Sequence, residues 1–330
     1  MSQTMLDRRS FGAATLCAML PGMARTQAVA AAFPSRAVRL VVPTPPGSAP
    51  DIRGRQLAQK LSDEWQQPVI VDNRPGASER LAMDAALQSP PDGYTLMLGL
   101  NAMTISPHLV KLPFDPLREF AAVTRVSSGP LILLTSPGAA IGSIAELVAY
   151  AGVNPGKLNA AHPGVGTLPH LAFALFGKTA GIDMLNVPYG GGGGAKMAAD
   201  LIAGQVQLAF NVASPVLTHL KSGRMRALAV ASPSRLAILP EVPTFAELGF
   251  PAMNVMGWGG VFVRTGTPQE LIDTLNKTLV KVLEHPDIRQ SMLETGEVAG
   301  GDSPDQFRAF ILSEHARWGK VIADAGIRLE

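Results

Sequence analysis

The strongest constraint on the fold is a regular alternation of short apolar runs and amphipathic stretches that begins near residue 38. The apolar runs at 38–43, 69–71 and 94–99 have the length and composition of buried strands. Between them, residues 51–64 and 81–87 space their apolar side chains as helices do. This β-α-β-α-β order predicts a parallel sheet covered by helices.

A second alternating block follows the first and predicts a second lobe. The sequence predicts strands at 122–126, 131–134, 158–161, 184–189, 206–210, 226–231 and 260–263. It predicts helices at 143–153, 168–179, 195–203, 215–222, 268–284, 286–295 and 304–325. A length of 330 residues with 47% hydrophobic content is enough for two cores and excludes a disordered chain. We therefore expect an α/β protein with two lobes.

The first 32 residues have the layout of an export signal. Arg8 and Arg9, with Phe11 after them, precede a short apolar run at 13–20, and a small-residue stretch follows at 28–32. Paired arginines before such a run resemble a twin-arginine signal, and an ordinary Sec signal is the alternative. The sequence thus predicts export, with cleavage after Ala30 or Ala32.

Cysteine and charge exclude several classes of protein. Cys17 is the single cysteine and lies inside the leader, so the mature chain has no disulfide or thiol chemistry. The net charge of +2 disappears with the leader, because Arg8, Arg9, Arg25 and Asp7 are removed together. A neutral mature chain with 5% aromatic residues does not indicate binding to nucleic acid, and no other segment is long and apolar enough to span a membrane.

Three glycine-containing loops follow predicted strands and lead into predicted helices. They cover residues 43–51, 161–167 and 190–194. Ligands of α/β sheets bind beyond the carboxyl ends of the strands, where helix N-termini offer free N–H groups. Asp51 and Thr167 are the expected N-caps. These loops predict an anion site made of neutral donors, which fits a carboxylate, and no nucleotide motif is present.

Catalytic patterns are weak. The six histidines form neither an H-x-x-x-H nor an H-E-x-x-H pair, and no G-x-S-x-G motif occurs. His162 with Asp51 is the one pairing that could serve an enzyme, although nothing in the sequence brings the two together. Trp258 stands just before a predicted strand and could line a cleft. We expect no cofactor, no metal and no catalytic residue.

Taken together, the motifs of the mature chain resemble those of the Bug (TctC-like) family, the periplasmic solute-binding proteins of tripartite tricarboxylate transporters. The resemblance extends from Phe33 to the C-terminus and includes Pro45, Pro46, Gly47 and Asp51. Further matching segments are 67–77, 91–96, 112–116, 155–159, 187–189, 204–206, 226–230, 239–244 and 266–268.

The resemblance implies a type II periplasmic-binding-protein fold whose two lobes close around a ligand cleft. The expected boundaries are 33–128 with 232–330 for the first lobe and 129–231 for the second. It implies a periplasmic, monomeric receptor that carries a small organic carboxylate to the membrane components of the transporter. The expected ligand-binding residues are Thr44, Pro45, Pro46, Gly47, Ser48, Asp51, His162, Gly164, Gly166, Thr167, Tyr189, Gly191, Asn211 and Trp258. Asn73 and Arg74 are expected to stabilise the fold instead.

Several positions differ from the family pattern, and they cluster around the expected cleft. They include Thr44, where an aromatic residue is common, and Ser48, where a second glycine is common. Residues 78–80 replace a glycine-rich stretch, Gly190 stands where a basic residue is usual, and an acidic residue is common near Asn211. The identity of the ligand therefore does not follow from the resemblance. A ligand-presenting partner of a signalling system and a periplasmic enzyme remain the alternatives.

Overall fold

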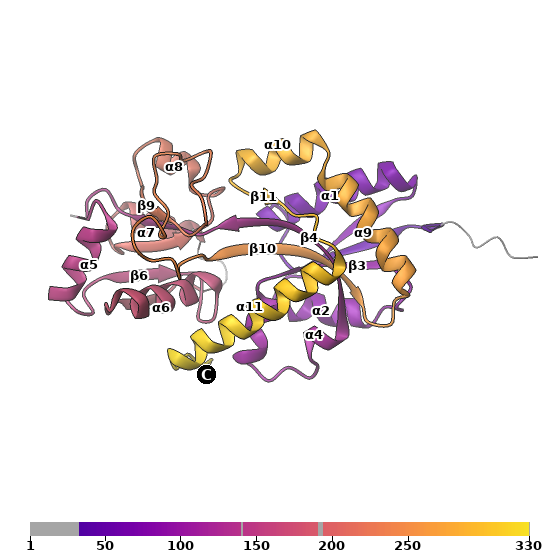
Figure 1. The fold of residues 1–330 in the computed structure, drawn as a ribbon, viewed down its shortest axis with the longest axis horizontal. Coiled ribbons are helices and arrows are strands. Elements are labelled where there is room, and N and C mark those ends of the chain that lie inside the picture. Colours follow the sequence, from indigo (N-terminus) through magenta and orange to yellow (C-terminus); the bar gives the residue numbers. More distant parts are fainter. Residues whose placement is uncertain (1–32, 140, 191–193, 330) are drawn as a thin grey trace, which may run out of the picture.

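The computed structural model describes residues 33–139, 141–190 and 194–329. The expected leader (1–32) and Gly191 lie outside these residues. The described chain forms two lobes side by side along its longest axis, each built on its own sheet (Figure 1).

The first lobe contains a six-stranded sheet in the order β11-β4-β10-β3-β1-β2. The strands are β1 (Val38–Val42), β2 (Val69–Asn73), β3 (Thr95–Leu100), β4 (Phe120–Pro130), β10 (Met256–Arg264) and β11 (Val298–Ala299). β1 pairs in parallel with β2 and β3, as the β-α-β-α-β order predicts. β10 lies between β3 and β4 and is antiparallel to both.

The helices of this lobe flank the sheet and its loops. They are α1 (Ala49–Trp65), α2 (Arg80–Leu87), α3 (Ala102–Ile105), the 3-10 turn η1 (Ser106–His108), α4 (Pro116–Glu119), α9 (Gln269–Leu283), α10 (Pro286–Glu294) and α11 (Pro304–Asp324). Leu57 and Leu61 of α1 pack with Leu275 and Leu279 of α9 and with Leu98 on one face of the sheet. Each such side chain contributes about 1.5–3 kcal/mol when fully buried.

The second lobe contains a five-stranded sheet in the order β7-β6-β8-β5-β9. The strands are β5 (Ile132–Thr135), β6 (Asn159–His162), β7 (Leu185–Pro188), β8 (Leu208–Asn211) and β9 (Arg226–Val230). Its helices are α5 (Ile144–Val153), α6 (Leu168–Ala180), α7 (Gly194–Ile202) and α8 (Leu217–Lys221). β6, β7 and β8 are parallel, and β5 is antiparallel to β8 and β9.

The predicted strands and long helices are confirmed, and the sheets are mixed rather than purely parallel. Apolar periodicity identifies a strand but not its direction, so the antiparallel placement of β5 and β10 could not be predicted. The short elements α3, η1, α4 and β11 were not predicted either, because they are too short to show a period.

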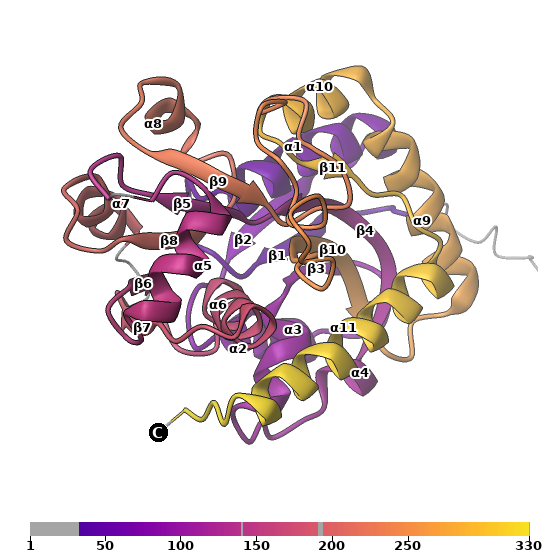
Figure 2. The same cartoon turned by 60° about the vertical axis from the view of Figure 1, so that its left-hand side comes forward.

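Three segments connect the lobes. β4 continues into β5, and the chain returns from Val255 into β10, with Leu131 N–H donating to Val255 O at 3.0 Å. The third connection is α11, whose Trp318 and Ile322 are buried in the core of the second lobe. Figure 2 shows α11 running from the first lobe past α3 to α6.

Residues 232–255 pack on the second lobe. Thr244 forms a bridge with Val230, and Phe245 belongs to the same core as Phe176 and Phe210. The expected boundaries assign this segment to the first lobe. From its packing we propose instead that the first lobe resumes at about residue 256.

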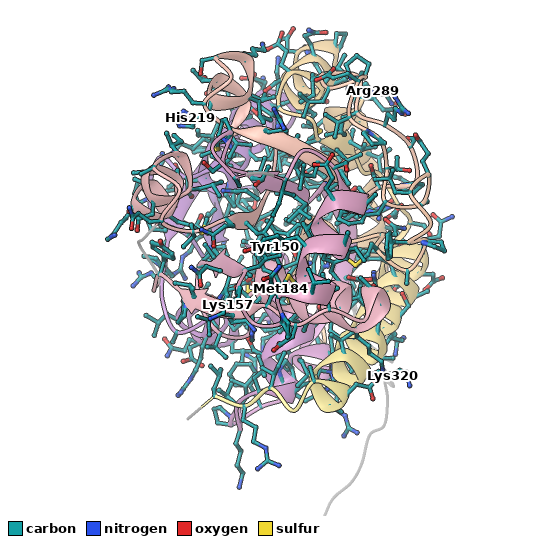
Figure 3. The ribbon with its side chains drawn as sticks, turned by 90° about the vertical axis from the view of Figure 1, so that its left-hand side faces the viewer. Tyr150, Lys157, Met184, His219, Arg289 and Lys320 are labelled. Atoms are coloured by element: carbon teal, nitrogen blue, oxygen red, sulfur yellow. The ribbon has the colours of Figure 1, made fainter. Side chains whose placement is uncertain are left out.

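The outer end of the second lobe faces the viewer in Figure 3, where Tyr150 of α5 is exposed.

Within residues 33–139, 141–190 and 194–329, none of the helices combines the length and apolar character that crossing a membrane requires.

Candidate functional site

The loop between β1 and α1 is folded onto itself by hydrogen bonds. Ser48, not Asp51, is the N-cap residue of α1, and its hydroxyl lies 2.7 Å from the Thr44 hydroxyl and 2.8 Å from the Pro45 carbonyl. Gly47 has φ +83°, a conformation that L side chains rarely adopt. Pro45, Pro46 and Gly47 are exposed, so the tip of the loop is free to meet a ligand.

Asp51 does not cap α1; instead, hydrogen bonds from three residues converge on its side chain. Its side chain is 1% exposed and accepts hydrogen bonds from Gly47 N–H (2.8 Å), Arg55 Nε (3.0 Å) and Asn73 Nδ2 (2.8 Å). Burial raises the pKa of Asp51, but the hydrogen bonds from Arg55, Gly47 and Asn73 outweigh burial, so its pKa lies below the usual value. Asp51 is therefore a buried carboxylate that accepts hydrogen bonds from its own protein and, through them, holds the loop in position.

The loop between β6 and α6 is held in a similar way. Thr167 is the N-cap residue of α6, as predicted, and its hydroxyl donates to Gly164 O at 2.7 Å. Gly166 has φ +77°, and its N–H donates to His170 Nδ1 at 3.1 Å. A Cβ atom at Gly166 would lie 2.3 Å from Leu109 Cδ1 of the first lobe. This glycine therefore allows the two lobes to approach each other.

His162 lies beneath this loop as a fully buried side chain. Its ring stacks on His170 with centroids 4.4 Å apart, and neither of its nitrogens has a hydrogen-bond partner of good geometry among the described residues. Burial lowers the pKa of His162, with the backbone of Gly164 opposing the shift in part. Burial, and then the charge of His162, lower the pKa of His170 to about 4. Both rings are therefore mainly neutral at pH 7, and neither adds a positive charge beneath this loop.

Tyr189 ends the segment that follows β7. Its hydroxyl donates to Asp200 Oδ2 at 2.7 Å, and Lys196 donates to the same oxygen at 2.6 Å. Burial, and then the hydrogen bond and charge of Asp200, raise the pKa of Tyr189 to about 12. The hydroxyl is thus hydrogen-bonded to a residue of α7, and the aromatic ring is the part of Tyr189 that remains available to a ligand. Gly191, which was predicted beside it, lies outside the described residues.

A cavity of about 200 Å³ lies between the lobes; we call it the interlobe cavity. Its wall comes from the start of α1, the ends of β3 and β8, the strands β4 and β10 and the α10–β11 loop. The polar residues lining it include Arg53, Asn101, Ser127, Ser214 and Glu297. Larger hollows occur elsewhere, such as one of about 380 Å³ between α4, α9 and α11, but that one is lined by the first lobe alone. The interlobe cavity is at the carboxyl ends of parallel strands from both lobes, where α/β proteins bind ligands.

Of the predicted site residues that the structure describes, Trp258 lines the interlobe cavity and the others do not. Its indole packs in the opposite direction, edge-on against Phe307 and Phe310, and it is 3% exposed. Asn211 ends β8 directly before the lining residue Val212, and Ser48 directly precedes the lining residue Ala49. The loops 43–51 and 161–167 therefore remain predicted ligand contacts.

Sequence reasoning missed Arg53, Asn101 and Glu297. Asn101 directly follows β3, so inspection of that strand end would have found it. Arg53 lies one turn inside α1, and Glu297 comes from a distant loop. Nothing in the sequence signals that these two residues meet.

Glu79 is a further buried carboxylate near the cavity. It is 9% exposed and accepts hydrogen bonds from Leu100 N–H (2.9 Å) and Ala102 N–H (3.2 Å), on either side of Asn101. Burial raises its pKa to about 7, with the two N–H groups opposing the shift. Glu79 ends a run of three left-handed residues, with Ala77 at φ 47° and Ser78 at φ 50°.

The structure offers no support for a catalytic pair. No hydrogen bond or ion pair joins His162 to Asp51 in the described part of the chain, and each belongs to a different lobe. Across residues 33–139, 141–190 and 194–329, no group of three His, Cys, Asp or Glu side chains could hold a metal ion.

Two α/β lobes with a cavity between them, at the ends of their strands, define a solute-binding protein of the periplasmic type with the type II fold. The chain belongs to the TctC family, described as the tripartite tricarboxylate transporter family receptor, whose sequence model matches residues 54–327. Proteins of this family are periplasmic solute-binding proteins.

Known relatives agree with this assignment. Protein BugT of Bordetella pertussis (strain Tohama I) is 34% identical over 301 residues, which is 90% of this chain and 92% of BugT. The structure of R. palustris Rpa4515 with adipate has a TM-score of 0.80 at 33% identity and covers 90% of this chain and 100% of that one. MatC (Rpa3494) from Rhodopseudomonas palustris with bound malate has a TM-score of 0.76 at 27% identity and covers 88% of this chain and 100% of that one.

Proposed function

We propose that this protein is a non-catalytic receptor that captures a small organic carboxylate between its lobes for the membrane components of a tripartite tricarboxylate transporter. The observation that carries the proposal is the interlobe cavity, which both lobes line at the ends of β3 and β8. Pockets for drug-sized ligands are about 300–1,000 Å³, so a cavity of about 200 Å³ suits a smaller solute.

The chemistry of the ligand is supported by two relatives and by the loops. Rpa4515 was solved with adipate and MatC with malate, and both ligands are carboxylates. In this chain the loops at 43–51 and 161–167 contain the exposed Gly47 and the half-buried Gly164 and Gly166, and apart from the buried Asp51 their side chains are neutral. Neutral hydrogen-bond donors can hold a carboxylate without a buried cation.

The proposed ligand contacts outside the cavity wall come from three loops and one strand end. They are Thr44, Pro45, Pro46, Gly47, Ser48, Asp51, His162, Gly164, Gly166, Thr167, Tyr189, Gly191 and Asn211. Asp51 acts through the position of the β1–α1 loop, and Tyr189 acts through its ring, because the polar atoms of both already have partners.

We propose that the leader at 1–32 directs export, with the twin-arginine pattern at Arg8 and Arg9, and is then cleaved. The mature receptor acts as a monomer in the periplasm. It needs no cofactor and carries out no reaction. In support, His162 and Asp51 are both buried, lie in different lobes, and share no hydrogen bond among the described residues.

The experiment is native mass spectrometry of the mature protein purified from periplasm, followed by thermal shift against small carboxylates and their uncharged amides. We expect a co-purifying carboxylate and a rise in stability of about 2.7 kcal/mol at a 100-fold excess over Kd. The amides serve as the matched control and should shift the transition less. Turnover of a ligand by NMR, or no shift with any carboxylate, would refute the proposal.

A further inference from the structure

The charged groups in the wall of the interlobe cavity neutralise each other. Arg53 and Glu297 are the charged side chains among its described lining residues. Arg53 Nη2 lies 3.3 Å from Glu297 Oε1, and the two side chains are 7% and 20% exposed. The wall therefore carries one positive and one negative charge in contact, and its net charge is zero.

Both terminal nitrogens of the Arg53 guanidinium already have partners. Its Nη1 lies 2.6 Å from Gln56 Oε1 and 3.4 Å from Ser291 Oγ, and its Nη2 lies 3.5 Å from Thr295 Oγ1 as well as beside Glu297. Its Nε is buried and has no partner among the described residues. A carboxylate that enters the cavity would therefore meet a cation whose charge is already paired with Glu297 and which has one N–H, that of Nε, left to donate.

A second carboxylate lies just behind the wall. Glu79 receives the N–H groups on both sides of the lining residue Asn101, and no cation within the described ranges forms an ion pair with it. At neutral pH and above, Glu79 adds negative charge next to the cavity. This charge repels an anion bound there, because low-dielectric surroundings screen charges poorly.

The rest of the wall is apolar, with a few neutral donors. The apolar part includes Pro50, Leu98, Leu100, Val126, Val212 and Ala213. Asn101 Nδ2 makes one long hydrogen bond, to Met256 O at 3.4 Å, and can donate a second one. The hydroxyls of Ser127 and Ser214 also line the cavity. Such a wall can bury the hydrocarbon chain of a ligand and donate hydrogen bonds to a polar group at one end of that ligand.

From this balance we propose that the receptor selects ligands with a single carboxylate on a small apolar body and rejects dicarboxylates, with the Arg53–Glu297 pair as the specificity determinant. The inference rests on the proposed function. It separates this chain from its relatives, since adipate and malate, bound in Rpa4515 and MatC, each carry two carboxylates.

The test compares ligands of equal chain length on the wild-type mature protein by isothermal titration calorimetry. The pairs are hexanoate with adipate and butyrate with succinate. We expect the monocarboxylate of each pair to bind at least about tenfold more tightly. If adipate and succinate bind as tightly as their partners or more tightly, the inference is wrong and the receptor function stands. If no carboxylate binds, the proposed function itself fails.

Two variants test the ion pair directly. Glu297→Gln leaves the charge of Arg53 uncompensated, so we expect the affinity for adipate to rise about tenfold while hexanoate changes less. Adding Arg53→Gln to it makes the wall neutral again and should restore the preference for hexanoate. Glu294→Gln removes an exposed acid three residues away in α10 and is the matched control, with no change expected.

The variants decide whether the Arg53–Glu297 pair determines ligand specificity. An unchanged ratio of adipate to hexanoate affinity in folded Glu297→Gln would overturn the role of the pair. Folding is checked by circular dichroism, and if the variants do not fold, the comparison on the wild-type protein still settles the specificity.

Discussion

The side-chain amide of Asn73 donates a hydrogen bond of 2.8 Å to Asp51 Oδ1 and a second one of 2.9 Å to the Thr44 carbonyl. These bonds join the end of β2 to the β1–α1 loop. The shape of the loop therefore depends on a residue from the neighbouring strand. Asn73 was expected to stabilise the fold, and its contacts agree with that role.

Asn73→Ala should destabilise the protein by about 1–3 kcal/mol, because it removes the donor to Oδ1 of the buried Asp51 carboxylate and to the Thr44 carbonyl. Urea unfolding measures the loss. The pKa of Asp51 is depressed, so its contribution is present above the ordinary value of 3.8 and is lost as the pH falls through the folded-state pKa. The exposed Asn186→Ala is the control, and an equal loss there would contradict the prediction.

Tyr189→Phe should cost about 0.5–1.5 kcal/mol, since it removes the hydrogen bond to Asp200. Ligand affinity should stay within about twofold, because the hydroxyl is already bonded to α7. Tyr189→Ala removes the ring as well and should weaken binding further. Calorimetry separates the two variants, and a large loss of affinity in Tyr189→Phe would show that the hydroxyl contacts the ligand.

Gly166→Ala should be costly for two reasons. The residue has φ +77°, and its new Cβ would lie 2.3 Å from Leu109 Cδ1. The left-handed conformation costs about 1–2 kcal/mol, and overpacking adds about 1–3 kcal/mol. Gly181→Ala, at φ +64° with open space around it, is the matched control and should show the first cost alone.

The double variant Gly166→Ala/Leu109→Ala checks the cause. Truncating Leu109 should recover the overpacking part, so the two changes should be non-additive by about 0.5–3 kcal/mol in thermal unfolding. Strict additivity would show that the two residues do not touch.

Glu79→Gln should change how stability depends on pH. Burial raises the pKa of Glu79 from 4.5 to about 7 in the folded state, so folding favours its protonated form. Its stabilising contribution is complete below the unfolded value and is lost as the pH rises toward about 7. The wild-type protein should therefore lose stability relative to Glu79→Gln by up to about 1.4 kcal/mol per pH unit across this window. Parallel pH curves for the two proteins would refute the shift.

Much of the fold was readable from periodicity, because both lobes are built from short apolar strands and amphipathic helices. The order of strands was not readable in full. β10 reaches the middle of the first sheet from more than 150 residues beyond β3, and no local pattern encodes that distance.

The candidate site was predicted less well than the fold. The strand-end rule selected the loops around Gly47 and Gly166, whose backbone conformations favour glycine, and their contact with a ligand remains a prediction. It could not find the Arg53–Glu297 contact, which depends on the packing of α1 against a loop after α10. Trp258 was placed at the cleft by its position, yet its indole packs the other way, since side chains alternate along a strand.

The position of β10 also bears on how the chain acquires its structure during synthesis. The five strands of the second sheet come from one continuous segment, so this sheet can form early, although Trp318 and Ile322 of α11 join its core only later. The first sheet must wait, because β3 and β4 become neighbours only through a strand made after the whole second sheet. Until then both strands have an unpaired edge, and such edges are prone to aggregation. The edges of β3 and β4 in the nascent receptor are therefore open to pairing with other chains until β10 has been made.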